Sequence, residues 1–286
     1  MQCVNPILVT HPNGYKIKVP CGKCVNCKAT NVQQWVQRLT DEMFANDVTY
    51  FVTLSYDDKN VQYVIDENGA PVQTLNRQDY THFLQKLKYQ CDLRLIRMRY
   101  FGCGEYGKST SRPHYHFVLF FKFATGEMPN STAMSQFILQ NWTLGQINAA
   151  VPVTNADVFG YICKDMYKNH NRLLEDKRLQ TFHTMSRRPA IGVGYVQNHV
   201  KFFEDAVKRR DRLVYVPRVY KKYLNLTDED KQRITELNLL DDYAKRLQAA
   251  KARGETVDLD YLQILQSNKS LAGIRKNRID SKKERF

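Results

Sequence analysis

Two histidines one residue apart, His114 and His116, are the strongest candidates for chemistry in this sequence. An apolar residue recurs at every second position over residues 115–121, a pattern that predicts a buried β-strand. Side chains two positions apart share one face of a strand, so both imidazoles are expected to point away from the apolar face. Two imidazoles held together on a rigid strand can bind one divalent cation. The alternative is a pair of ordinary surface histidines.

A carboxylate, Glu105, is expected to complete this metal site. Residues 95–103 predict a second strand, and the polar residues 108–111 separate it from the histidines, as in a β-hairpin. Such a hairpin would return Glu105 to a position close to His114. One carboxylate and two imidazoles can hold Mg²⁺ or Mn²⁺ and leave coordination positions open for substrate oxygens. The alternative for Glu105 is a solvated turn residue.

Tyr161 is the candidate nucleophile, on a predicted helix. At about 100° per residue, the apolar positions of residues 159–168, Tyr167 among them, fall on one side of that helix. The opposite, polar side carries Tyr161, Lys164, Asp165 and Lys168. Nearby lysine charges would favour the phenolate form of Tyr161, which is the better nucleophile. The alternative is an ordinary tyrosine on a solvated helix face.

Four cysteines near the start of the chain form a second candidate metal site. Cys3, Cys21, Cys24 and Cys27 include two Cys-x-x-Cys spacings, which suit a tetrahedral structural Zn²⁺. The spacing is atypical, because three of the thiols are bunched and the fourth lies far upstream. Redox-active or simply reduced thiols are the alternative.

The overall charge points to a polyanionic partner. The 286 residues carry a net charge of +14 with a sequence pI near 9.4, a balance most often associated with nucleic acid. Aromatic residues make up 12% of the chain, and unpaired bases stack on aromatic rings. No stretch approaches the roughly 20 apolar residues of a membrane span, and the first residues lack the pattern of a signal peptide. We therefore expect a cytoplasmic protein with no membrane partner.

Two basic segments are candidate DNA contacts. Arg187 and Arg188 lie in a glycine-containing loop whose amides and guanidinium groups could hold phosphates. Residues 215–222 interleave aromatic rings with cations, as single-strand binders do. The cations in that segment are Arg218, Lys221 and Lys222.

The elements that must position these groups predict an α+β fold. An amphipathic helix is expected over residues 32–43, a strand over residues 50–56 and a helix capped by Asn76. The two hairpin strands follow, and then short helices. The composition shifts after residue 224, so residues 1–224 are interpreted as one domain. Residues 225–286 are interpreted as a helical appendage with a basic tail.

Three motifs, in this order, resemble those of HUH endonucleases. They are aromatic-Val-Thr-Leu-Ser-Tyr at 51–56, Glu105 with Arg-Pro-His-Tyr-His at 112–116, and Tyr161-x-x-Lys164. Over about residues 1–223 the chain resembles replication initiation proteins of gokushovirus-like Microviridae, which are small single-stranded DNA phages. The cysteine cluster, Trp142-x-x-Gly145 and the segments 185–189 and 217–222 extend that match. The combination is specific, whereas each motif alone is not.

The resemblance implies a central antiparallel sheet of ferredoxin or RNA-recognition-motif type, with helices packed on one side. It implies nicking of the phage origin in single-stranded DNA, a 5′-phosphotyrosine intermediate and religation in rolling-circle replication, all in the cytoplasm of the bacterial host. The residues carried over are the metal ligands His114, His116 and Glu105, the nucleophile Tyr161 with Lys164 and Lys168 beside it, and Tyr56 as a DNA contact. Because the sequence has no Gly-x-x-x-x-Gly-Lys phosphate loop, a host helicase is an expected partner.

One departure and two alternatives stay open. Such relatives often carry two tyrosines four residues apart, but Asp165 occupies the second position here. One tyrosine would then perform both transfers, or Tyr167 would take part, or Asp165 would contact the metal or orient Tyr161. The alternative functions are a noncatalytic zinc-containing protein that binds single-stranded nucleic acid and a plasmid-type relaxase.

Overall fold

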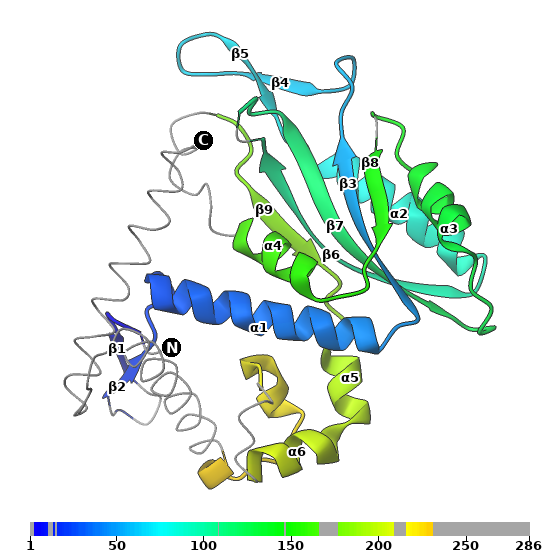
Figure 1. The fold of residues 1–286 in the computed structure, drawn as a ribbon. Helices are drawn as coiled ribbons and strands as arrows, with labels where there is room; N and C mark the ends of the chain where they lie inside the picture. Colours follow the sequence, from blue (N-terminus) through cyan, green and yellow to red (C-terminus); the bar gives the residue numbers. More distant parts are fainter. Residues whose placement is uncertain are drawn as a thin grey trace, which may run out of the picture. The chain divides into compact units, whose positions relative to one another are not determined.

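The computed structural model describes residues 3–10, 14, 16–107, 109–145, 147–165, 177–208 and 216–230 (Figure 1). The chain forms two compact units, considered separately below. One is Trp35–Asn198, and the other combines Met1–Gln34 with His199–Phe286. The expected appendage, residues 225–286, falls almost entirely outside the described residues, so a division at residue 224 stays a prediction.

The unit Trp35–Asn198 is built on a five-stranded antiparallel sheet, which confirms the predicted α+β class. Its strand order is β8-β3-β7-β6-β9. The bounds are β3 Val48–Ser55, β6 Ile96–Tyr106, β7 Pro113–Phe123, β8 Ile147–Pro152 and β9 Phe182–Met185. The central strands β6 and β7 form the predicted hairpin, and each is 11 residues long. β7 is buried along almost its whole length because aromatic and aliphatic residues occupy both of its faces.

Helices α2 (Arg77–Asp92) and α3 (Ser131–Leu139) cover one face of this sheet (Figure 1). The amide oxygen of Asn76 accepts a hydrogen bond from the backbone N–H of Gln78, so Asn76 caps α2 as predicted. The buried residues of α2 include the predicted stripe: Tyr80, Phe83, Leu84 and Leu87. They pack against every second side chain of β7, from Tyr115 to Phe121.

The opposite face is also covered, by residues 35–44 of α1 (Val25–Phe44) and by α4 (Asp157–Asp165). The ring of Trp35 lies 4.9 Å from that of Phe101 on β6, and Val118 and Phe120 of β7 are fully buried on this side. The expectation that helices pack on one side only is therefore wrong. The physical reason is the composition of β7, whose second apolar face also has to be removed from water.

Smaller elements complete the described structure. Strands β4 (Gln62–Ile65) and β5 (Pro71–Thr74) form the hairpin that the Asn-Gly signal at residues 68–69 predicts. α5 (Val193–Asn198) ends the first unit. The second unit contains a hairpin of β1 (Ile7–Thr10) and β2 (Lys16–Val19), the start of α1, α6 (Val200–Lys208) and the 3-10 turn η1 (Arg218–Lys222). Within the described residues, no helix combines the length and the apolar character needed to cross a membrane.

Candidate functional site

The β6–β7 register brings the three predicted metal ligands to one end of the sheet. Glu105 pairs directly with His114, and His116 lies two residues further along β7. All three side chains share one face because strand residues alternate. Glu105 lies within β6, which extends beyond the predicted end at Cys103, so it belongs to the sheet and not to the turn.

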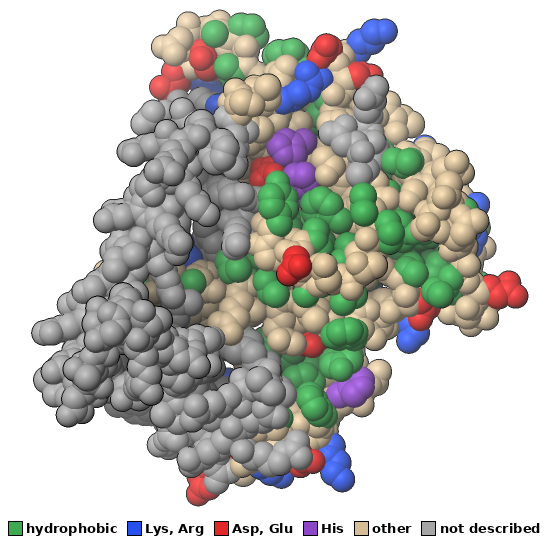
Figure 2. Space-filling view, viewed as in Figure 1, with side chains coloured by type: hydrophobic (Ala, Val, Ile, Leu, Met, Phe, Trp, Pro, Cys, Tyr) green, Lys and Arg blue, Asp and Glu red, His purple; other side chains and the backbone are tan. Residues whose placement is uncertain are grey.

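The distances between these side chains fit a common ligand set. The Oε1 atom of Glu105 lies 3.1 Å from Nε2 of His114 and 2.9 Å from Nε2 of His116. One candidate ligand atom from each residue lies within 4.8 Å of the others. In Figure 2, two neighbouring histidine side chains and an acidic one are exposed at the edge of a group of apolar side chains. The site is thus partly shielded but open to solvent.

Both imidazole rings are held through their Nδ1 atoms. Nδ1 of His114 lies 3.0 Å from the carbonyl oxygen of Arg112, and Nδ1 of His116 lies 3.0 Å from Oγ1 of Thr53. Phe51 stacks on the His116 ring at 5.3 Å between centroids. Metal-binding histidines commonly donate their second N–H to such a partner, which orients the ring and raises its basicity as a ligand. Both Nε2 atoms therefore face the Glu105 carboxylate.

The electrostatics of this arrangement favour a cation. A carbonyl oxygen can only accept, so Nδ1 of His114 donates, and a neutral His114 would turn the lone pair of Nε2 toward a carboxylate. A proton or a metal ion removes that repulsion. Burial opposes ionisation of Glu105, but hydrogen bonds from His114 and His116 outweigh it and lower the Glu105 pKa to about 2. Burial likewise opposes protonation of His114, but Glu105 and the Arg112 carbonyl raise its pKa.

Tyr161 lies beside this ligand set. Its ring centroid is 5.9 Å from that of His116 and 6.3 Å from that of Phe51, with both pairs edge to face. The side chain is 48% exposed, whereas Phe159 and Ile162 of the same helix are fully buried. The predicted division of α4 into an apolar and a polar side is therefore confirmed. The phenol is accessible from solvent, next to the potential metal ligands.

The expected lowering of the Tyr161 pKa is not what its described surroundings produce. Burial, and then the charges of Glu105 and Cys103, raise that pKa above its ordinary value. The side chains of Lys164 and Asp165, together with Tyr167 and Lys168, lie outside the described residues. Their predicted roles stay predictions.

Two residues of the site were not predicted from the sequence as functional, namely Phe51 and Thr53. The apolar alternation of Tyr50, Val52 and Leu54 already indicates that Phe51 and Thr53 occupy the other face of β3. What the pattern lacks is the pairing of Thr53 with His116 across β3 and β7. That pairing brings the hydroxyl to the imidazole.

Tyr56 does not have the exposed position that a DNA contact needs. It is only 3% exposed, and it donates a hydrogen bond to Asp79 on α2 and shares another with the hydroxyl of Tyr115. Tyr56 follows the parity of Leu54 and faces the α2 side of the sheet. A buried ring cannot stack on a base, so the predicted DNA contact of Tyr56 is wrong.

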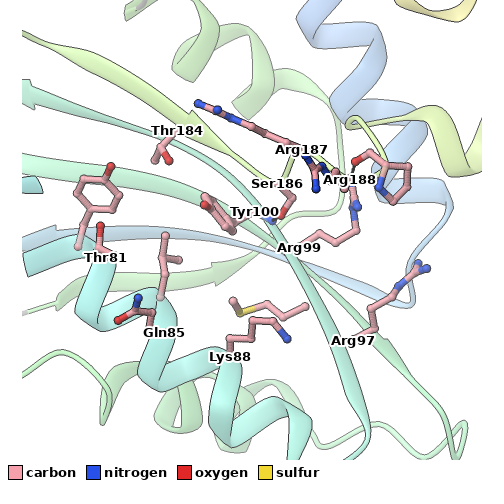
Figure 3. Close-up of a pocket in the computed structure, with 14 residues that line it drawn as sticks. Thr81, Gln85, Lys88, Arg97, Arg99, Tyr100, Thr184, Ser186, Arg187 and Arg188 are labelled. Atoms are coloured by element: carbon pink, nitrogen blue, oxygen red, sulfur yellow. Dashed lines mark hydrogen bonds between the residues drawn. The ribbon is translucent and has the colours of Figure 1, made fainter. Parts of the chain in front are cut away.

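Arg187 and Arg188 line a groove of about 520 Å³ at the half of β6 that lies beyond the end of β9 (Figure 3). The cationic residues lining it are Lys88, Arg97, Arg99, Arg187 and Arg188, and no carboxylate is among its lining residues. Arg99 is engaged internally, with Nε 2.6 Å from the Glu42 carboxylate and Nη2 donating to the Pro189 carbonyl oxygen. The other four cations are exposed. The groove therefore suits a phosphate-bearing ligand.

In the second unit, η1 carries the other predicted DNA contacts. Arg218 and Lys222 are exposed and Lys221 is half-buried, whereas Tyr220 is fully buried and packs on Phe203 at 5.9 Å. The predicted interleaving of rings and cations thus resolves into an inner ring and outer charges. The cations remain available to a polyanion, but the Tyr220 ring does not.

Comparisons with known proteins agree with the order of the motifs. Residues 49–170 match a family model that describes replication-associated proteins of the ORF2 type. The chain is 33% identical over 127 residues to replication-associated protein ORF2 of Spiroplasma virus 4, which covers 44% of this chain and 38% of the relative. It is 27% identical over 195 residues to replication-associated protein VP4 of Bdellovibrio phage phiMH2K, which covers 63% of this chain and 58% of the relative.

The chain therefore spans less than two thirds of the length of either relative. No solved structure matches it significantly. The predicted resemblance to replication proteins of phages of this type is confirmed over the matched residues.

Proposed function

From this similarity to phage replication-associated proteins, we propose that the protein initiates DNA replication by nicking single-stranded DNA at the origin and later rejoining it. The observation that carries the proposal is the position of Tyr161, whose ring lies 5.9 Å from that of His116. A potential nucleophile and a potential metal site then share one solvent-facing surface. Single-stranded origin DNA in the bacterial host cytoplasm is the proposed substrate.

The chain's own residues would prepare the site. Glu105, His114 and His116 would bind the metal, and Thr53 and the Arg112 carbonyl would keep both Nε2 atoms directed at it. When bound, a divalent cation would polarise the scissile phosphate, neutralise charge developing on its oxygens and offset the effect of Glu105 on Tyr161. A mixed carboxylate and imidazole set favours Mn²⁺ over Mg²⁺, because imidazole is a softer ligand than oxygen.

The transfer step exchanges one phosphodiester bond for another. The Oη atom of Tyr161 attacks the phosphorus and loses its proton, while the bond from phosphorus to the 3′ oxygen breaks and that oxygen gains a proton. The product is a 5′-phosphotyrosine and a free 3′-hydroxyl. Attack by a 3′-hydroxyl on the phosphotyrosine reverses the step and releases Tyr161. No nucleotide cofactor is consumed, because the bond energy is retained in the protein–DNA linkage.

The groove that contains Arg187 and Arg188 would bind the DNA backbone away from the reacting phosphate. Tyr100, at the groove, and Glu105 are five residues apart on β6, or roughly 17 Å at about 3.3 Å per residue. Lysine and arginine contacts with phosphates supply affinity without reading sequence. A host helicase would separate the strands as replication proceeds.

The test is formation of a covalent protein–DNA adduct. The full chain is incubated with a random-sequence single-stranded DNA library and Mn²⁺, and the products are separated on a denaturing gel. We expect a protein-linked band whose sequenced DNA ends share one junction. Tyr161→Phe should abolish the band and retain DNA binding, whereas Tyr89→Phe, at an exposed tyrosine of α2, should leave it unchanged.

An adduct that persists in Tyr161→Phe would move the nucleophile elsewhere. DNA binding without any adduct in the wild-type protein would favour the noncatalytic alternative.

A further inference from the structure

The four cysteines of the N-terminal segment converge on one point. The Sγ atom of Cys3 lies 3.4 Å from that of Cys21 and 3.8 Å from that of Cys24, and the Sγ atoms of Cys21 and Cys27 are 4.0 Å apart. All four sulfurs lie within 4.8 Å of one another. A tetrahedron with zinc–sulfur bonds of about 2.3 Å places its sulfurs about 3.8 Å apart. The observed separations bracket that value.

Backbone N–H groups point at these sulfurs. The amides of Cys21, Cys24 and Cys27 donate to the Sγ atoms of Cys3, Cys21 and Cys24, respectively, over 3.3–3.4 Å. Cys24 also caps α1, because its carbonyl accepts the N–H of Lys28 and its sulfur accepts the N–H of the third helical residue. Such donors and the N-terminal end of a helix stabilise thiolate charge, and thiolate is the form that binds metal.

The surrounding structure lacks another means of holding itself together. The β1–β2 hairpin has four residues in each strand, and Ile7 and Leu8 are 50% and 57% exposed. An isolated two-stranded hairpin is marginally stable in water. Cys3 and Cys21 stand at the two ends of this hairpin, and Cys27 stands in the first turn of α1. A bond network through the four sulfurs would fix the hairpin to the helix.

We propose that Cys3, Cys21, Cys24 and Cys27 bind one structural zinc ion, separate from the catalytic metal. Four thiolates select a soft or borderline metal and suit tetrahedral zinc, whereas they are poor ligands for Mg²⁺ and Mn²⁺. Four protein ligands leave no coordination position for substrate. The ion therefore organises the N-terminal segment and takes no part in nicking.

The test measures zinc in the full chain purified under reducing conditions without added metal. We expect one zinc per chain that is lost in Cys27→Ser and retained in Cys91→Ala, whose cysteine is buried in α2. His116→Ala should also retain it, which excludes the Glu105 site as the source. Replacement by Co²⁺ should give thiolate-to-metal charge-transfer absorption and the visible bands of a tetrahedral site.

A second measurement needs no variant, in case Cys27→Ser fails to fold. The cluster thiols of the wild-type protein should resist alkylation until a strong chelator is added, and chelation should then expose residues 7–19 to proteolysis. The proposal is overturned if the reduced protein holds no zinc, if it holds iron instead, or if these cysteines pair as disulfides. Zinc content unchanged in Cys27→Ser would overturn it as well. None of these readouts depends on nicking, so failure of either proposal leaves the other standing.

Discussion

The hydroxyl of Thr53 offers a sharp test of how the catalytic metal site is built. Oγ1 of Thr53 lies 3.0 Å from Nδ1 of His116, whose side chain is only 9% exposed. Thr53→Val keeps the shape and the β-branched character of the side chain and removes this one polar partner. The imidazole then has no hydroxyl to direct its Nε2 atom toward Glu105.

The expected magnitude follows from that burial. Leaving a buried polar nitrogen without its partner costs about 1–3 kcal/mol, and loss of an outer hydrogen bond to a metal-binding histidine typically weakens metal binding 10–100-fold. The two ranges agree, because a tenfold change in affinity corresponds to about 1.4 kcal/mol. We therefore expect Mn²⁺ to bind 10–100-fold more weakly, and adduct formation to need correspondingly more Mn²⁺.

The assay is calorimetric titration of metal-stripped protein with Mn²⁺, alongside thermal unfolding. Thr49→Val is a matched control, because Thr49 is buried on the same face of the same strand. Its hydroxyl has no hydrogen-bond partner within the part of the chain that the structure describes. That control should keep Mn²⁺ affinity and raise the free energy of unfolding by about 1 kcal/mol, because an unsatisfied buried hydroxyl is removed. Mn²⁺ affinity in Thr53→Val within twofold of wild type would refute the reasoning.

Two further predictions concern charge. In metal-free protein, the ion pair of Glu105 with His114 should stabilise most between pH 4.5 and 6.5, the ordinary pKa values of the two groups. Its contribution is lost below that window as pH falls through the lowered Glu105 pKa of about 2, and above it as pH rises through the raised His114 pKa. Denaturant unfolding with a chelator should therefore show Glu105→Gln more destabilising at pH 5.5 than at pH 9, and an equal effect at both values would contradict the pairing. In DNA binding, the double variant Arg187→Ala, Arg188→Ala should weaken single-strand affinity and reduce the salt slope by about 0.7 for each phosphate that the variant no longer neutralises. Lys122→Ala, which removes an exposed charge outside the groove, should change neither value, and equal losses in both variants would mean that net charge alone acts.

Much of the candidate site was predictable because it depends on local periodicity. Strand alternation places His114 and His116 on one face, the hairpin turn returns Glu105 to them, and helical phase separates Tyr161 from Phe159. These relations involve residues close in sequence. They needed no knowledge of which elements pack together.

Other features depend on contacts between distant segments. Tyr56 looked like a motif residue at the end of a strand, but its hydroxyl is bound by Asp79 and Tyr115, which lie 23 and 59 residues away. The contact of Thr53 with His116 likewise depends on how β3 pairs with β7. A sequence pattern contains no information on such pairings unless the partner is already known.

The sequence by itself determined the class of fold, the likeness to phage replication proteins and the faces on which the histidines and Tyr161 stand. Those follow from residue type and from the repeat lengths of strand and helix. Only the tertiary structure decided that helices cover both faces of the sheet, that the Tyr161 ring lies against His116 and that Thr53 holds the imidazole. The physical reason is that strand register and helix docking are set by the packing of apolar side chains from residues far apart in the chain.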